Sequence, residues 1–152
     1  MRIEDWMQRP VQCVRPLDSL QRAREIMADQ RINQLPVVVE GKLLGIVTDR
    51  DLRDAYPSVF ECWPRGRAAE AVAAIPKQIT VELVMTTNVL TLSPKASLVE
   101  AARLMRTERI GAIPIVDNDR LVGILTRSDI LDAFLALTEG REQHAGRTPR
   151  PA

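Results

Sequence analysis

The stretch QLPVVVEGKLLGIVT, residues 34–48, occurs a second time as AIPIVDNDRLVGILT, residues 112–126. Each copy contains two apolar runs rich in β-branched residues, and a short turn separates the runs, at Glu40-Gly41 or at Asp117–Asp119. This pattern predicts a β-hairpin of buried strands. A shift of 78 positions aligns residues 6–56 with 84–134 without a gap, and 18 of the 51 pairs are identical. The chain therefore contains two copies of one structural unit.

The residues on either side of each hairpin predict the same further elements in both copies. A helix is expected before each hairpin, because apolar residues recur there at helical spacing; Ser97 and Glu100 add a capping-box pattern in the second copy. A second helix is expected directly after each hairpin. In full, the first copy predicts a helical lead-in at Glu4–Gln8, a strand at Val11–Val14, a helix containing Leu20, Ala23, Ile26 and Met27, the hairpin, and a helix at Asp51–Ala55. The last helix of the second copy is expected at Asp129–Leu137.

The repeat sets the expected domain boundaries. We expect the first repeat over residues 1–60, a linker over 61–80, the second repeat over 81–137 and a disordered tail over 138–152, because the tail is almost entirely polar. An alanine-rich helix is expected at Arg67–Ile75 within the unduplicated segment. Phe60 and Trp63 either cap the core, which is the favoured interpretation, or form a patch that binds a partner.

Composition excludes several classes of function. The 152 residues carry a net charge of +1, so no overall field attracts nucleic acid or an anionic membrane. The longest apolar runs are the length of a strand, and Met1 is followed by charged residues, so we expect a cytoplasmic protein. Cys13 and Cys62 have neither metal-ligand spacing nor a disulfide-rich context, and both are interpreted as ordinary thiols.

The residues with chemical potential stand at the end of each hairpin, in the pattern Gly-h-h-Thr-x-x-Asp, where h is apolar. Gly45 and Gly123 allow a ligand or another backbone to approach the strand. The pairs Thr48/Asp51 and Thr126/Asp129 have two interpretations. Each threonine can cap the helix while the aspartate meets the positive end of its dipole, or the pair can bind a ligand. On spacing alone, capping is favoured.

Several motifs together resemble the CBS domain, named after cystathionine β-synthase. They are the Met7/Met85 lead-ins, Pro16 and Pro94, the segments 32–38 and 110–116 that contain Pro-Val or Pro-Ile, and the two Gly-h-h-Thr-x-x-Asp endings. Two such domains in tandem look like a Bateman module, and the arrangement is similar to small acetoin-utilisation-like bacterial CBS proteins. The resemblance implies an α/β (α+β) fold of two β-α-β-β-α repeats, packed sheet to sheet with pseudo-twofold symmetry. It also implies two clefts that bind adenine nucleotides or related adenosyl compounds.

The resemblance assigns roles to individual residues. The ribose diol falls to Asp51 in one cleft and Asp129 in the other, since an ionised carboxylate accepts hydrogen bonds from hydroxyls. Thr48 and Thr126 match a hydroxyl contact near the ribose and phosphate. Ile46 and Ile124 match the apolar wall beside the base. Gln12 and Leu17 are expected beside the adenine of the Asp129 cleft, and Leu90 and Lys95 beside that of the Asp51 cleft. The groups expected to face the phosphates, near the pseudo-twofold axis, are Asn33, Gln34, Arg50, Arg127 and Ser128.

The chain departs from the family pattern where phosphate charge is concerned. Members that bind highly charged nucleotides have a cation just before Pro-Val, whereas this chain has Asn33-Gln34 in one copy and Gly111-Ala112 in the other. The charge for a polyphosphate therefore rests on Arg50 and Arg127. The alternative is that these arginines are solvated and pair with Asp49 or Asp54. A monophosphate or an uncharged adenosyl ligand is easier to accommodate than a triphosphate.

Three functions remain open on the sequence. The favoured one is a non-enzymatic sensor that requires no cofactor, binds an adenosyl ligand such as AMP, ADP, ATP, S-adenosylmethionine or NAD, forms a homodimer and regulates an unknown partner in trans. The second is a structural dimerisation or docking module without a ligand. The third, a nucleic-acid binder, is disfavoured by the balanced charge. An enzyme is disfavoured because the sequence has no cysteine-histidine pair, P-loop or zinc ligand set.

Overall fold

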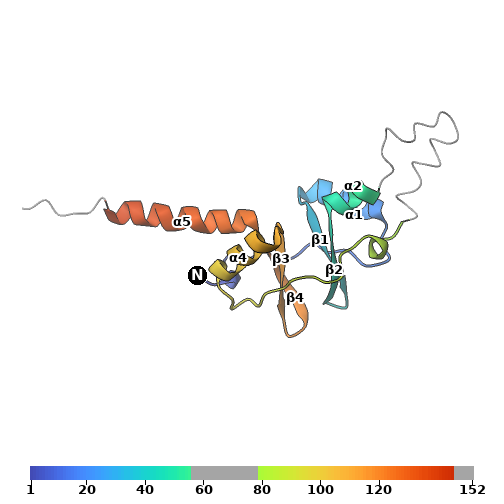
Figure 1. Cartoon of the computed structure of the whole chain (residues 1–152), viewed down its shortest axis with the longest axis horizontal. Helices are drawn as coiled ribbons and strands as arrows, with labels where there is room; N and C mark the ends of the chain where they lie inside the picture. Colours follow the sequence, from blue (N-terminus) through green and yellow to red (C-terminus); the bar gives the residue numbers. More distant parts are fainter. Residues whose placement is uncertain (56–78, 146–152) are drawn as a thin grey trace, which may run out of the picture.

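The structure, a computed structural model, describes residues 1–55 and 79–145, and the side chains as far as residue 139. Its elements are η1 (Ile3–Asp5), α1 (Leu20–Gln30), β1 (Gln34–Val39), β2 (Lys42–Thr48), α2 (Asp49–Ala55), η2 (Val81–Leu83), α4 (Leu98–Glu108), β3 (Ala112–Asp117), β4 (Arg120–Thr126) and α5 (Arg127–Ala145). Figure 1 shows the two helix-hairpin-helix units. The helix expected at Arg67–Ile75, the side chains of Phe60 and Trp63, and Cys62 lie outside the described residues.

Both hairpins are antiparallel and have the same register. Gln34 pairs with Thr48 at the open end of the first hairpin, and Ala112 pairs with Thr126 in the second. The turns lie where the sequence predicts them, and their residues have positive φ: 52° at Glu40, 85° at Gly41, 47° at Asn118 and 63° at Asp119. Two successive residues with positive φ match the right-handed twist of a two-stranded ribbon. The hairpin prediction is therefore confirmed in both copies.

The helix before the second hairpin begins at the predicted cap, Ser97, and the helix before the first begins at the equivalent residue, Ser19. The Ser97 hydroxyl accepts a hydrogen bond of 3.1 Å from the backbone N–H of Glu100, and Ser19 accepts the same bond from Arg22. The strand expected at Val11–Val14 is shorter than predicted, because only Val14 pairs with the sheet, in a parallel bridge to Val37. Pro36 on β1 has no backbone N–H to donate to the residue 12 carbonyl, so the pairing does not extend back toward Val11. The lead-in helix is a single 3-10 turn at Ile3–Asp5.

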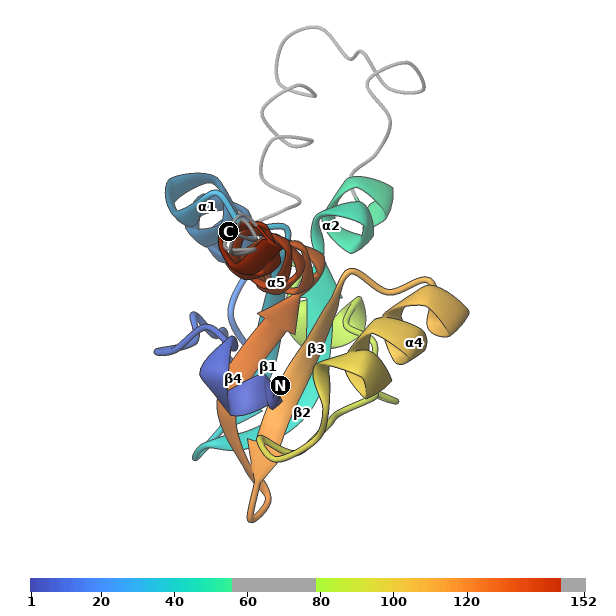
Figure 2. The same cartoon turned by 90° about the vertical axis from the view of Figure 1, so that its left-hand side faces the viewer.

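Each hydrophobic core contains residues from both repeats. Ile3 and Met7 lie in the core around the second hairpin, with Leu98, Ile113 and Leu125. In the same way Val81 lies in the core around the first hairpin, and Met85 packs against that core. The segments that lead into the two repeats, residues 3–8 and 81–86, are thus exchanged, because each packs against the core of the other repeat. An alignment of the two copies cannot show this exchange of the lead-in segments. Figure 2 shows the first residues of the chain beside β4.

The exchange explains the glycine of each Gly-h-h-Thr-x-x-Asp ending. A β-carbon added to Gly45 would stand 2.7 Å from Met85 Sδ and 2.9 Å from the Thr86 carbonyl oxygen. A β-carbon on Gly123 would overlap the side chain of Met7. The sequence left open whether a ligand or another backbone approaches each glycine. In the structure, the lead-in segment of the other repeat lies against it.

The last helix is longer than predicted. We expected disorder from Thr138, but α5 continues to Ala145 and projects from the body of the molecule (Figure 1). The Thr138 hydroxyl donates to the carbonyl oxygens of Phe134 and Leu135, so it does not end the helix. The glutamate, arginine and glutamine residues that follow also have good helix propensity. Residues 146–152 lie outside the described part of the chain.

No helix within residues 1–55 and 79–145 combines the length and the apolar character needed to cross a bilayer.

We predict that Gly45→Ala lowers the free energy of unfolding by about 1–3 kcal/mol, the usual cost of overpacking. The new methyl group meets a backbone carbonyl, which cannot move without disturbing the lead-in segment. Gly123→Ala is the matched control, because it meets only the flexible Met7 side chain and should cost less. Urea unfolding of both variants measures the difference. A larger loss in Gly123→Ala would contradict the packing described here.

Candidate functional site

The two aspartates that follow the hairpins are held in the same way. Asp51 Oδ2 accepts hydrogen bonds from the Thr48 backbone N–H at 2.7 Å and from the Thr48 hydroxyl at 2.8 Å. The Thr48 hydroxyl in turn accepts from the Asp51 N–H at 3.2 Å. In the second repeat, the corresponding distances between Thr126 and Asp129 are 2.6, 2.7 and 3.4 Å. Each pair is a reciprocal cap at the junction of strand and helix.

The capping interpretation of Thr-x-x-Asp is therefore confirmed, but it uses only half of each carboxylate. Both bonds from threonine end on Oδ2. Among the described residues, no hydrogen bond reaches Asp51 Oδ1. The cap thus fixes the aspartate in one orientation and leaves an acceptor for another group. A structural role and a binding role are compatible at this position.

The second aspartate has an additional partner that the sequence analysis missed. Gln8 Nε2 donates to Asp129 Oδ1 at 2.9 Å, across 121 positions of sequence. Asp129 is only 8% exposed and is the one charged residue classed as buried in the described part of the chain. Gln8 aligns with Thr86 under the 78-residue shift, so the difference between the copies was visible. The contact of Gln8 with Asp129 could not be predicted from this difference, because the contact depends on the exchange of the lead-in segments.

The residues expected to line the base lie close to the exchanged segments or near the helix starts. The backbone of Ile46 pairs with Thr86, and that of Ile124 pairs with Gln8. Four further expected residues are exposed in the segments before α1 and α4, namely Gln12, Leu17, Leu90 and Lys95. Leu17 is 74% exposed, which is unusual for so large an apolar side chain. No described hydrogen bond or core cluster joins these four residues to either aspartate, so their assignment to the clefts remains a prediction.

The structure brings part of the expected phosphate-facing group together. The Asn33 carbonyl accepts a bond from the Asp49 N–H at 2.8 Å, and the Gly111 carbonyl accepts one from the Arg127 N–H at 3.1 Å. Gln34 Oε1 lies 3.9 Å from the point that a Gly111 β-carbon would occupy. The segments before the two prolines therefore approach each other beside the start of α5.

The two arginines differ in their surroundings. Arg127 Nε donates to the Ile110 carbonyl at 3.1 Å, so its guanidinium is partly held by its own repeat. Arg50 is exposed, and within the described residues it makes neither a hydrogen bond nor an ion pair. Asp49 pairs instead with Arg53, at 3.2 Å. The alternative in which Arg50 pairs with Asp49 or Asp54 is therefore not observed. Ser128 is exposed at the position equivalent to Arg50.

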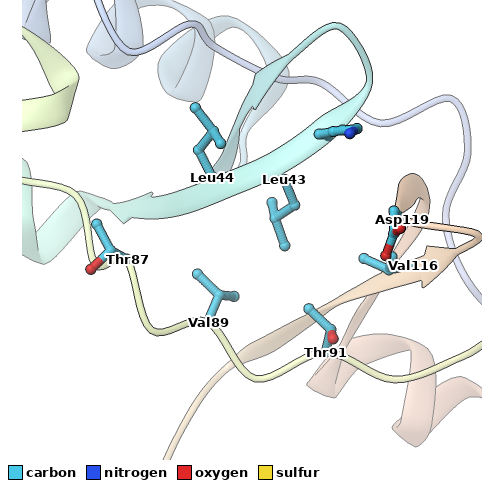
Figure 3. Close-up of a pocket in the computed structure, with 8 residues that line it drawn as sticks. Leu43, Leu44, Thr87, Val89, Thr91, Val116 and Asp119 are labelled. Carbon is cyan, nitrogen blue, oxygen red and sulfur yellow. The ribbon is translucent and has the colours of Figure 1, made fainter.

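A separate cavity of about 370 Å³ lies at the opposite end of the hairpins (Figure 3). Its lining comes from the first hairpin, from the segment before α4 and from the second hairpin: Lys42, Leu43, Leu44, Thr87, Val89, Thr91, Val116 and Asp119. Leu44 and Thr48 are four residue steps apart, which corresponds to roughly 13 Å along β2. None of the expected site residues lines this cavity.

No metal or thiol chemistry is indicated in the described residues. Residues 1–55 and 79–145 contain no group of three or more His, Cys, Asp or Glu side chains that could hold a metal ion. Cys13 is half-buried, and burial raises the pKa of its thiol. A thiol with a raised pKa is less often the reactive thiolate, which agrees with its interpretation as an ordinary thiol.

Comparisons with known proteins identify the repeats. The model of the CBS domain family matches residues 3–58 and 79–136. A Vibrio cholerae protein provisionally assigned as AcuB, an acetoin utilization protein, has a crystal structure similar to this chain, with a TM-score of 0.77 and 31% sequence identity. The match covers 99% of this chain and 98% of that one.

Two similar structures were determined with ligands. The CBS domain pair of protein MJ0100, in complex with 5-methylthioadenosine and S-adenosyl-L-methionine, is 31% identical over 90% of this chain and 98% of its own, with a TM-score of 0.70. CBSX2, a protein of Arabidopsis thaliana, in complex with AMP is 28% identical over the same shares, with a TM-score of 0.72. With the two matched segments and the duplicated strand-end motif, the chain belongs to the CBS domain family and contains a pair of these domains.

Proposed function

We propose that this chain is a non-catalytic regulatory module that binds an adenosyl compound through the ribose. One observation carries the proposal. Thr48 holds Asp51 by one carboxylate oxygen, and the other oxygen has no partner among the described residues. The complexes of MJ0100 with methylthioadenosine and S-adenosylmethionine, and of CBSX2 with AMP, support an adenosyl ligand.

The hydrogen-bond inventory of the site fits a pair of neighbouring hydroxyls. An ionised carboxylate oxygen has two acceptor positions, and both are available on Asp51 Oδ1. The Thr48 hydroxyl donates once and accepts once, which leaves one further acceptor position beside the carboxylate. A vicinal diol supplies two donors a short distance apart. Bonds to an ionised acceptor are about twice as strong as neutral ones, so this arrangement favours ribose.

The surroundings of the arginines favour a ligand with little negative charge. Arg50, one residue before Asp51, has a guanidinium that no other described residue engages, whereas Arg127 is partly engaged by the Ile110 carbonyl. We therefore place a phosphate group near Arg50 and expect a monophosphate such as AMP to bind better than ADP, ATP or NAD. S-adenosylmethionine, which has no phosphate, is the other favoured ligand. Lys95, Gln12, Leu17 and Leu90 remain the candidates for the surroundings of the base.

Regulation follows if the ligand changes the relation between the repeats. Each core contains a lead-in segment from the other repeat, so a ligand that contacts both repeats can favour one arrangement over another. Only a difference in affinity between the arrangements can shift their populations. We propose that the module acts in this way on a partner in trans. A cytoplasmic location remains a prediction of the sequence.

A second candidate function, assembly without a ligand, is favoured by one specific observation. The outer face of α5 exposes Leu131, Phe134 and Leu135 at 61%, 60% and 53%. These residues are spaced three and four apart and form one apolar stripe. We propose that a second copy of the chain covers this stripe in a twofold homodimer, which is compatible with ligand binding at the strand ends.

Asp51→Asn tests the ribose assignment. The asparagine oxygen can still accept from Thr48, but an amide donor then replaces the free acceptor, so we expect AMP affinity at this cleft to fall about 10- to 150-fold. Asp54→Asn, on the same helix and exposed, is the control and should leave affinity unchanged. Titration calorimetry measures both, after thermal-shift screening against AMP, S-adenosylmethionine, ADP, ATP and NAD. Unchanged binding in the double variant Asp51→Asn/Asp129→Asn would contradict the assignment.

Arg50→Ala tests the phosphate assignment. The ratio of AMP affinity to adenosine affinity should fall, because the variant loses a charge-assisted contact while the ribose contacts stay intact. Arg53→Ala removes an equal charge from the same helix, but its guanidinium already pairs with Asp49, so the ratio should remain that of the unaltered protein. Calorimetric titrations with both ligands give the two ratios. If the ratio does not change in Arg50→Ala, this residue does not contact the phosphate.

Phe134→Glu tests the dimer. A charge in the centre of the apolar stripe should prevent association, because burying an unpaired carboxylate is costly. Leu83→Glu is the control, since Leu83 is also highly exposed, at 72%, but lies far along the chain from α5. Sedimentation equilibrium at micromolar concentration should give a dimer for the unaltered protein and Leu83→Glu, and a monomer for Phe134→Glu. A monomeric unaltered protein would rule out this assembly.

A further inference from the structure

The two strand-end carboxylates are capped alike but differ at the outer oxygen. The bonds within the Thr48/Asp51 and Thr126/Asp129 caps match to within 0.2 Å. The outer oxygen, Oδ1, accepts a bond from Gln8 in the second repeat, whereas the described residues provide no such bond in the first. Asp129 is correspondingly buried, and Asp51 is only half-buried.

The difference comes from a single pair of aligned residues. Gln8 and Thr86 occupy equivalent backbone positions, because each pairs with the isoleucine of the opposite hairpin through two backbone hydrogen bonds. These bonds are 2.8 and 3.2 Å long for Gln8 with Ile124, and both are 2.9 Å for Thr86 with Ile46. The glutamine side chain is long enough to reach the carboxylate. The threonine side chain, two heavy atoms shorter, makes no hydrogen bond within the described part of the chain.

The two aspartates offer a diol different numbers of acceptor positions. Asp51 Oδ1 can accept two hydrogen bonds from a ligand. At Asp129 Oδ1 the Gln8 amide takes one of the two positions, so this oxygen can accept from only one ribose hydroxyl unless the ligand displaces the amide. The carboxamide therefore competes with the ligand at one cleft and not at the other.

We propose that Gln8 is a specificity residue that makes the two clefts unequal. An adenosyl ligand fills the Asp51 cleft first, and the Asp129 cleft binds it more weakly and discriminates less between ribose and 2′-deoxyribose. This inference rests on the proposed ribose site. It adds an order in which the two clefts are filled by the ligand. That order depends on residue 8, which belongs to the opposite repeat, and not on the Thr-x-x-Asp motif.

The test isolates each cleft and exchanges the two side chains. In the Asp51→Asn background, AMP reports on the Asp129 cleft, and Gln8→Thr should tighten its binding about two- to tenfold, the worth of one net hydrogen bond. In the Asp129→Asn background, the reciprocal Thr86→Gln should weaken AMP binding at the Asp51 cleft by a similar factor. Gln8→Thr in the Asp129→Asn background is the control and should change nothing.

A second measurement separates competition from a general structural effect. The ratio of AMP affinity to 2′-deoxy-AMP affinity at the Asp129 cleft should rise in Gln8→Thr, because Asp129 Oδ1 can then accept a charge-assisted bond from each of the two hydroxyls. Gln8 and Thr86 are both exposed, and each type of side chain already occupies the equivalent position in the other repeat. The temperature of thermal unfolding should therefore be nearly unchanged in these variants. If AMP binds but Gln8→Thr leaves its affinity and this ratio unchanged, or weakens binding, the inference about Gln8 is overturned alone. Failure of AMP and S-adenosylmethionine to bind any of these proteins would overturn the ribose site as well.

Discussion

The fold and the candidate site both depend on the reciprocal bond between threonine and aspartate at the end of each hairpin. It begins α2 and α5 directly at the strand ends, with no connecting loop, since Thr48 and Thr126 are the last residues of β2 and β4. It also holds the carboxylate by one oxygen, so the direction of the other is fixed by the fold. A binding group held in this way does not lose side-chain freedom when a ligand arrives, which lowers the entropic cost of binding.

The exchanged lead-in segments connect the threonine-aspartate cap of each repeat to the other repeat. Met7 and Met85 each pack against the glycine of the opposite hairpin, and the residue that follows each methionine pairs with the isoleucine of that hairpin. Gln8 lies in the segment of the first repeat that packs in the second core, so its bond to Asp129 joins the two repeats at the strand end. Each core thus contains a segment of the other repeat, which is the physical basis of the proposed coupling between ligand binding at the strand ends and the arrangement of the repeats.

Local features could be predicted from the sequence, and non-local ones could not. The hairpins, their turns and the Ser97 cap follow from short patterns with a direct physical cause, and the structure shows them at the expected residues. The exchange of Ile3 and Met7 into the second core could not be read from the alignment, because both lead-in segments have the same pattern wherever they pack. The extension of α5 was missed because the polar composition was taken as disorder, although its residues favour a helix once a packed turn precedes them.

The candidate site shows the same division. Thr-x-x-Asp predicted a cap, and the cap is present. The family resemblance added the ribose role, which depends on an oxygen that spacing alone cannot assign. Gln8 was invisible as a site residue, since its distance of 121 positions from Asp129 is bridged only by the fold.

A crystal structure of the protein with AMP tests the proposed ribose site most directly. We expect a ribose hydroxyl within hydrogen-bond distance of Asp51 Oδ1, while Oδ2 keeps both bonds from Thr48. AMP bound in the cavity lined by Leu43, Val89 and Val116, with Asp51 Oδ1 not in contact with it, would contradict the central claim that the fold uses one carboxylate oxygen and the ligand uses the other.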